Sequence, residues 1–203
     1  DVATINVTQP SEVDAVAKLV DLVPLAIWKR YLSARVLNAA AETLPEAFRA
    51  AHFAFHGKAL TGAEQQKARW QQATAQLNGA LGEAVGRIYV AKHFPPAAKA
   101  RMDELVANLM RAYANSIDTL SWMSPETRAQ ARDKLAHYTV KIGYPQLWRD
   151  YSRLEIRDGD PTGNALRAAR FEYERNVARV NGKVDRSEWH MSPQTVNAYY
   201  NSS

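Results

Sequence analysis

The chain of 203 residues contains no cysteine. This absence excludes disulfide bonds, thiolate metal ligands and a cysteine nucleophile. The sequence also has no apolar run close to the roughly 20 residues that a transmembrane helix needs. No serine lies in a Gly-x-Ser-x-Gly turn, and no glycine-rich phosphate loop occurs. The best-known nucleophile and nucleotide-binding motifs are therefore missing from this chain.

Charge of one sign is never concentrated, although the chain carries a net charge of +5. A basic balance is compatible with nucleic-acid binding. Acidic and basic residues interleave, however, and no block of five like charges occurs, which is typical of a mixed, solvated surface. The tryptophans are spread from Trp28 to Trp189 without regularly spaced basic partners. We therefore expect no nucleic-acid partner.

Two histidines have the spacing of a zinc site. His52 and His56 are four residues apart, as in a helical His-x-x-x-His pair. Phe53 occupies the position at which that motif carries its general-base glutamate, and no acidic third ligand is obvious nearby. We interpret the pair as ordinary helix residues and predict neither a metal ligand nor a catalytic residue in this chain. The remaining histidines are scattered at the boundaries of predicted elements: His93, His137 and His190.

Helical periodicity covers residues 11–137. Pro95-Pro96 starts the longest predicted helix, which runs over 97–120 and has apolar residues at steps of three and four that place them on one face. Ser124 and Pro125 then start another helix, with Ser124 as its N-cap. The apolar face comprises Met102, Leu105, Val106, Leu109, Met110, Tyr113, Ile117 and Leu120.

Other start and stop signals divide the rest of this region. Capping boxes predict helices beginning near Ser11, Thr43 and Thr61. Pro24 separates the first two helices, and Gly57 is expected to end the third. Residues 1–137 therefore predict an all-helical domain of about seven helices.

The pattern changes after His137. Alternating residues predict short strands over 138–142 and 196–200, and a further possible strand over 154–157. A helix is expected over about 164–180, and Ser192-Pro193 favours a second helix start. A strand at 196–200 would offer unpaired backbone donors and acceptors to a neighbour.

Five segments resemble the neprilysin-type zinc metallopeptidases, the family that includes neprilysin, endothelin-converting enzyme and bacterial oligopeptidases. The bacterial branch is the most similar, and the likeness covers essentially the whole chain. The segments are LGEAVGRIYV at 81–90, SWMSPET at 121–127, KIGYP at 141–145, VDRSEW at 184–189 and VNAYY at 196–200.

The resemblance implies a mainly α fold in which a helical lid closes over a thermolysin-like catalytic lobe. Residues 1–137 would form the multi-helix lid domain. Residues 138–203 would be the return segment, a small β-containing portion that leads into the truncated lobe. The family's zinc-binding His-Glu-x-x-His helix is expected after Ser203 in the full-length enzyme.

It follows that the parent protein is expected to be a zinc metalloendopeptidase of short peptides. Its partners would be those peptides and the remainder of the catalytic domain, and its location periplasmic or extracellular. The chain made alone is expected neither to bind zinc tightly nor to cleave peptides.

One pair of site residues is carried over from the resemblance. Asn197 and Ala198 match the family's Asn-Ala pair, whose side-chain amide and main chain hold the backbone of the bound peptide. An edge strand can accept an extended peptide, and an amide can both donate and accept. Two alternatives stay open: Asn197 ends a helix begun at Ser192, or the chain is a freestanding helical protein- or peptide-binding module. A reading frame that continues into a His-Glu-x-x-His segment would favour the peptidase.

Overall fold

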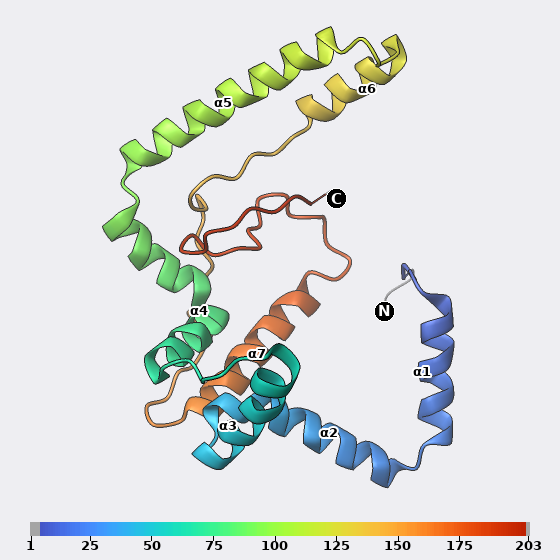
Figure 1. Ribbon diagram of the computed structural model, residues 1–203, viewed down its shortest axis with the longest axis vertical. Helices are drawn as coiled ribbons and strands as arrows, with labels where there is room; N and C mark the ends of the chain where they lie inside the picture. Colours follow the sequence, from blue (N-terminus) through green and yellow to red (C-terminus); the bar gives the residue numbers. More distant parts are fainter. Residues whose placement is uncertain (1–4, 202–203) are drawn as a thin grey trace. The chain divides into compact units, whose positions relative to one another are not determined.

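The computed structural model describes residues 5–201, and its fold is helical (Figure 1). The mainly α class predicted from the sequence is confirmed. Over the described residues, no helix combines the length and the apolar character that crossing a bilayer requires. In chain order the helices are α1 (Pro10–Leu22), α2 (Leu25–Ala40), the 3-10 turn η1 (Ala41–Thr43), α3 (Glu46–His52), the π-helix η2 (Phe53–Ala59), α4 (Arg69–His93), α5 (Pro96–Thr119), α6 (Pro125–Ala136) and α7 (Pro161–Ala178).

Proline and a local cap fix several helix starts. Pro96, Pro125 and Pro161 each begin a helix, at a position where the missing N–H costs no hydrogen bond. Ser124 is the N-cap of α6, as predicted, and its hydroxyl accepts the N–H of Thr127 at 3.2 Å. These sequence signals are local, which is why they located α5 and α6 correctly.

The three predicted capping boxes are not formed. Helix α1 begins at Pro10 without a side-chain cap, and α3 begins at Glu46 after Pro45. The hydroxyl of Thr43 donates to the carbonyl oxygen of Ala40 at 2.8 Å instead. The largest error concerns Thr61, because residues 62–68 are not helical and α4 begins only at Arg69.

The predicted stop at Gly57 is also wrong. Gly57 lies inside η2, where its lack of a side chain accommodates the Phe53 ring; a Cβ there would lie 2.4 Å from that ring. The helical segment ends at Gly62, whose φ of +72° is the left-handed conformation that favours glycine. Its N–H donates to the carbonyl oxygen of Lys58 at 3.1 Å.

None of the predicted strands is present among residues 5–201. The segments 138–142, 154–157 and 196–200 carry no strand. A strand needs a neighbour for its backbone groups. Here side chains bind some of these backbone groups in place of a neighbouring strand. The carbonyl oxygen of Ile142, for example, accepts a hydrogen bond from the ammonium of Lys99 at 3.1 Å.

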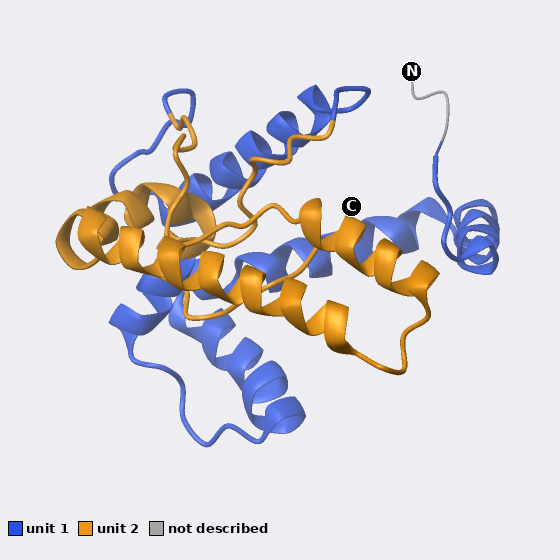
Figure 2. Ribbon diagram, turned by 90° about the horizontal axis from the view of Figure 1, so that it is seen from above, with its two compact units in different colours: residues 1–76, 152–183 blue, residues 77–151, 184–203 orange. Residues whose placement is uncertain are grey.

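Contacts group the chain into two units (Figure 2). Unit 1 comprises Asp1–Gln76 and Ser152–Lys183, and unit 2 comprises Leu77–Tyr151 and Val184–Ser203. Helix α4 therefore begins in unit 1 and continues in unit 2. The sequence predicts a division after His137, into a lid domain and a segment that leads into the catalytic lobe. The contacts within this chain do not test that division, which stays a prediction.

Unit 1 is centred on η1 and α7. Ala41 in η1 and Ala168 in α7 are its buried apolar residues, with 3% and 8% of their surface exposed. The hydroxyl of Thr162, in the first turn of α7, donates to the hydroxyl oxygen of Thr43 at 3.0 Å. Asp160 caps α7 by accepting the N–H of Gly163 at 2.9 Å. Small residues thus allow α7 to approach η1 closely.

Unit 2 contains α5, α6 and the second half of α4. The long helix α5 has no buried residue among those described, and Leu105 and Tyr113 on its predicted apolar face are each 54% exposed. Helix α6 returns alongside the end of α5 (Figure 1). Asp118 of α5 and Arg132 of α6 form a two-contact ion pair, in which Nε donates to Oδ1 at 2.6 Å.

Candidate functional site

The segment Gly82–Arg87 of α4 belongs to unit 2. Leu81, just before it, departs from helical geometry with φ −131° and ψ 32° and produces a kink. The two glycines that follow, Gly82 and Gly86, are both buried. Since they are four residues apart, they lie on one face of the helix.

This glycine face receives the C-terminal segment of the chain. A Cβ at Gly82 would lie 2.5 Å from the hydroxyl oxygen of Ser192, and a Cβ at Gly86 would lie 2.6 Å from Cδ of Pro193. Both separations are far below van der Waals contact. The helix can therefore approach the tail this closely only because these positions are glycine.

Gln194 holds the same segment by hydrogen bonds. Its side-chain amide donates to the carbonyl oxygen of Gly82 at 3.1 Å and to Oδ1 of Asn78 at 3.0 Å. Residues 191–194 are partly buried, whereas residues 195–200 are exposed. We call residues Ser192–Gln194, docked on Gly82 and Gly86, the glycine seat.

Asn197 and Ala198, the predicted peptide-holding pair, follow the glycine seat directly. Both are exposed, and Oδ1 of Asn197 accepts the N–H of Ala198 at 2.8 Å. The helix expected from Ser192 is not formed; one turn replaces it, with the N–H of Thr195 donating to the carbonyl oxygen of Ser192 at 3.0 Å. Asn197 therefore does not end a helix, and whether it binds peptide stays a prediction.

Two tyrosines fix the chain on the far side of this pair. The ring of Tyr200 stacks on Tyr138 with centroids 5.7 Å apart, and the ammonium of Lys134 lies 5.7 Å from the same ring. Tyr199 meets His190 edge-to-face at 5.8 Å. The exposed stretch 195–198 is thus held at both ends within unit 2.

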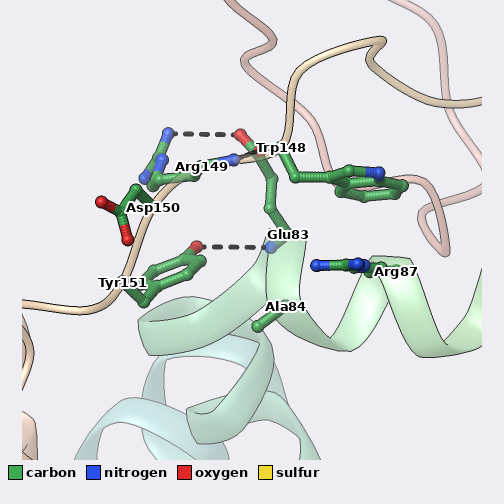
Figure 3. Close-up of a pocket in the computed structure, with 7 residues that line it drawn as sticks. All are labelled: Glu83, Ala84, Arg87, Trp148, Arg149, Asp150 and Tyr151. Carbon is green, nitrogen blue, oxygen red and sulfur yellow. Dashed lines mark hydrogen bonds and ion pairs between the residues drawn. The ribbon is translucent and has the colours of Figure 1, made fainter.

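A cavity of about 440 Å³ lies on another face of the Gly82–Arg87 segment (Figure 3). Glu83 organises it: its carboxylate accepts the backbone N–H of Arg149 at 2.8 Å and lies 3.6 Å from the guanidinium. The N–H of Glu83 donates to the hydroxyl of Tyr151 at 3.4 Å. Trp148 and Arg87 also line the cavity.

Sequence reasoning did not assign Gly82, Gly86, Glu83 or Gln194 to a site. Three of them lie in the segment LGEAVGRIYV, which contributed to the prediction only through its resemblance to the neprilysin-type peptidases. A signal was available, because two glycines four residues apart inside a helix indicate a close approach by another backbone. The partner of that approach could not be read from local pattern.

The histidines form no metal site among the described residues. His52 and His56 have ring centroids 4.4 Å apart, and Nε2 of His56 lies 2.8 Å from Oδ1 of Asn38. Across residues 5–201 no three His, Asp or Glu side chains gather in a way that could hold a metal ion. The donors that the structure brings together within residues 5–201 therefore do not make up a zinc site.

The described residues form a mainly helical protein, and comparison with known proteins shows its family. Residues 1–145 match the model of peptidase family M13. The chain belongs to this family of neprilysin-type metallopeptidases, and the match is to the model of the family's N-terminal domain.

Individual relatives agree with this assignment. The chain is 27% identical to neprilysin of Oryctolagus cuniculus, with 98% of this chain and 29% of that protein covered. It is 30% identical to human endothelin-converting enzyme-like 1, with 91% of this chain and 24% of that protein covered. The crystal structure of Mycobacterium tuberculosis zinc metalloprotease Zmp1 in complex with inhibitor matches with 45% identity and a TM-score of 0.84, over 92% of this chain and 28% of that one. The chain thus spans less than a third of the length of each.

Proposed function

We propose that this chain is the non-catalytic lid and substrate-edge part of a zinc-dependent metalloendopeptidase that hydrolyses short peptides inside a closed chamber. Membership of peptidase family M13 and the similarity to a zinc metalloprotease support the reaction class. The short share of each relative that the chain covers supports a partial role for it.

Asn197 and Ala198 hold the peptide backbone in this proposal. The observation that carries it is their exposure on a stretch anchored at both ends, where backbone and amide groups can meet an extended peptide. An amide that binds a peptide group does not read the neighbouring side chains. Such contacts favour an enzyme that accepts varied sequences.

Zinc and its ligands belong to the remainder of the catalytic domain. When bound there, zinc polarises the scissile carbonyl and activates water. The residues of this chain orient and enclose the peptide and supply no ligand. Short peptides and the catalytic domain are the proposed partners, nucleic acid is not, and the proposed location is periplasmic or extracellular.

The test is Asn197→Ala in the full-length enzyme, assayed on a short fluorogenic peptide. Deleting one hydrogen-bonding group of a site costs about 1–3 kcal/mol, which corresponds to a loss of roughly 5- to 150-fold in kcat/KM. Zinc content should be unchanged. Asn108→Ala is the matched control, because Asn108 is exposed on α5 and its side chain accepts a hydrogen bond from Arg111 of the same helix. Equal kcat/KM for Asn197→Ala and wild type would remove Asn197 from the site.

A further inference from the structure

We propose that Gly82, Gly86 and Gln194 are positioning residues for peptide binding: through the glycine seat they fix where Asn197 and Ala198 stand. This inference rests on the proposed role of Asn197 and Ala198. It adds residues of α4, more than 100 positions earlier in the chain, to the machinery that presents the peptide-holding pair.

The three glycines of α4 differ in how much room an added Cβ would find. Beside Gly79 nothing lies within 4 Å of an added Cβ. At Gly82 the obstructing atom is the hydroxyl oxygen of Ser192, which can rotate away. At Gly86 the main obstruction is the ring of Pro193, with Cδ at 2.6 Å and Cγ at 3.1 Å, and Oε1 of Gln194 also lies at 2.9 Å. The proline ring cannot rotate away. Only Gly86→Ala therefore forces the tail itself to move.

Gln194 fixes the direction of the seat through its amide donors. Both hydrogen bonds use Nε2, and the buried Oε1 has no hydrogen-bond partner among the described residues. The two neighbouring acceptors, Oδ1 of Asn78 and the carbonyl oxygen of Gly82, thus require a hydrogen-bond donor at position 194. Gln194→Glu, which adds no atom, would set a carboxylate oxygen against the carbonyl oxygen of Gly82, and these two acceptors repel each other.

Displacement at the seat passes to the peptide-holding pair because the connection is short. Only Thr195 and Val196 separate Gln194 from Asn197. Relieving the Gly86→Ala overlap requires Pro193 to move by about 1 Å, since ordinary carbon contacts lie at roughly 3.5–4.0 Å. A misplacement of about 1 Å can reduce turnover about 100-fold.

The experiment compares Gly86→Ala, Gly82→Ala and Gly79→Ala in the full-length enzyme, with kcat and KM measured on a short peptide. We expect kcat/KM to fall about 10- to 100-fold for Gly86→Ala and less for Gly82→Ala. Gly79→Ala should stay within about twofold of wild type. Adding Pro193→Ala, which removes the ring atoms but leaves Oε1 of Gln194, should restore part of the activity of Gly86→Ala.

A double-mutant cycle shows whether the seat acts through Asn197. In an Asn197→Ala background, Gly86→Ala should cost much less than it does alone, because the group it misplaces is already gone. Full additivity would overturn the inference, as would equal activity of Gly86→Ala and Gly79→Ala. Zinc content and thermal midpoint are measured for each variant. If Gly86→Ala does not accumulate as folded protein, Gln194→Glu replaces it in the double-mutant cycle with Asn197→Ala.

The outcomes also separate this inference from the proposed function. If Asn197→Ala lowers kcat/KM and neither Gly86→Ala nor Gln194→Glu does, only the positioning role fails. If Asn197→Ala itself leaves kcat/KM unchanged, both the role of Asn197 and the positioning role fail.

Discussion

The side-chain oxygen of Asn197 accepts the backbone N–H of Ala198 at 2.8 Å. This bond closes a small ring within two consecutive residues and sets the direction of the carboxamide. It engages the acceptor oxygen of Asn197, so the amide donors of Asn197 and the carbonyl oxygen of Ala198 are the groups that we propose meet a peptide.

Replacing the amide by a carboxylate tests which end of Asn197 binds. Asn197→Asp retains an oxygen that accepts the N–H of Ala198, but it has no amide donor. We expect kcat/KM to fall about as far as in Asn197→Ala, roughly 5- to 150-fold. Steady-state kinetics of the full-length enzyme measures it. Wild-type activity in Asn197→Asp would show that the donor is not used.

Glu83 should contribute to stability mainly as a hydrogen-bond acceptor. Its carboxylate accepts the N–H of Arg149, and Glu83→Ala leaves that partly buried group unsatisfied, at a cost of about 1–3 kcal/mol in the free energy of unfolding. Glu83→Gln keeps an acceptor and should lose less. Urea unfolding compares both with Glu104→Ala on the exposed surface of α5. Equal losses for the Ala and Gln variants would assign the effect to the ion pair instead.

The Asp118–Arg132 pair should make the α5–α6 hairpin sensitive to acid. Hydrogen bonds from Arg132, followed by the charge of its guanidinium, hold the pKa of Asp118 below its ordinary value. A depressed pKa means that the stabilisation is fully present above the unfolded value of about 3.9 and is lost as the pH falls through the lower folded value.

Asp118→Asn and Arg132→Gln should each remove this part of the pH dependence. Unfolding followed by helical circular dichroism, between about pH 6 and pH 2, compares the three proteins. The wild type should lose its advantage over both variants toward the acid end of that range. A constant difference across the range would show that Asp118 does not titrate in this way.

Helix starts in this chain were predictable where the signal is local. Ser124 and Pro125 located α6, and Pro96 located α5, because a cap and a fixed φ act within one turn. Thr61 misled for the opposite reason: its hydroxyl donates to the carbonyl oxygen of Gly57 at 2.7 Å and so closes the preceding helix rather than opening the next. A Ser/Thr side chain serves either end, and the sequence does not say which.

The candidate site was predictable only in part. Asn197 and Ala198 were named from a family resemblance, and their role remains a prediction. The glycine seat could not be foreseen, because it joins Gly82 to Gln194 across 112 positions of sequence and depends on the shape of both partners. Alternating residues at 196–200 gave a strand pattern, but a pattern cannot supply the neighbour that a sheet requires.

The two anchors around residues 195–198 have a consequence for conformational entropy. Ordering one residue of a free chain costs about 1–2 kcal/mol. Here the four residues 195–198 lose this entropy when the chain folds. Gln194 on one side and Tyr199 and Tyr200 on the other already restrict them. If Asn197 and Ala198 hold a peptide as proposed, that peptide has only its own freedom to lose on binding, and preorganisation of this kind strengthens binding without adding a contact.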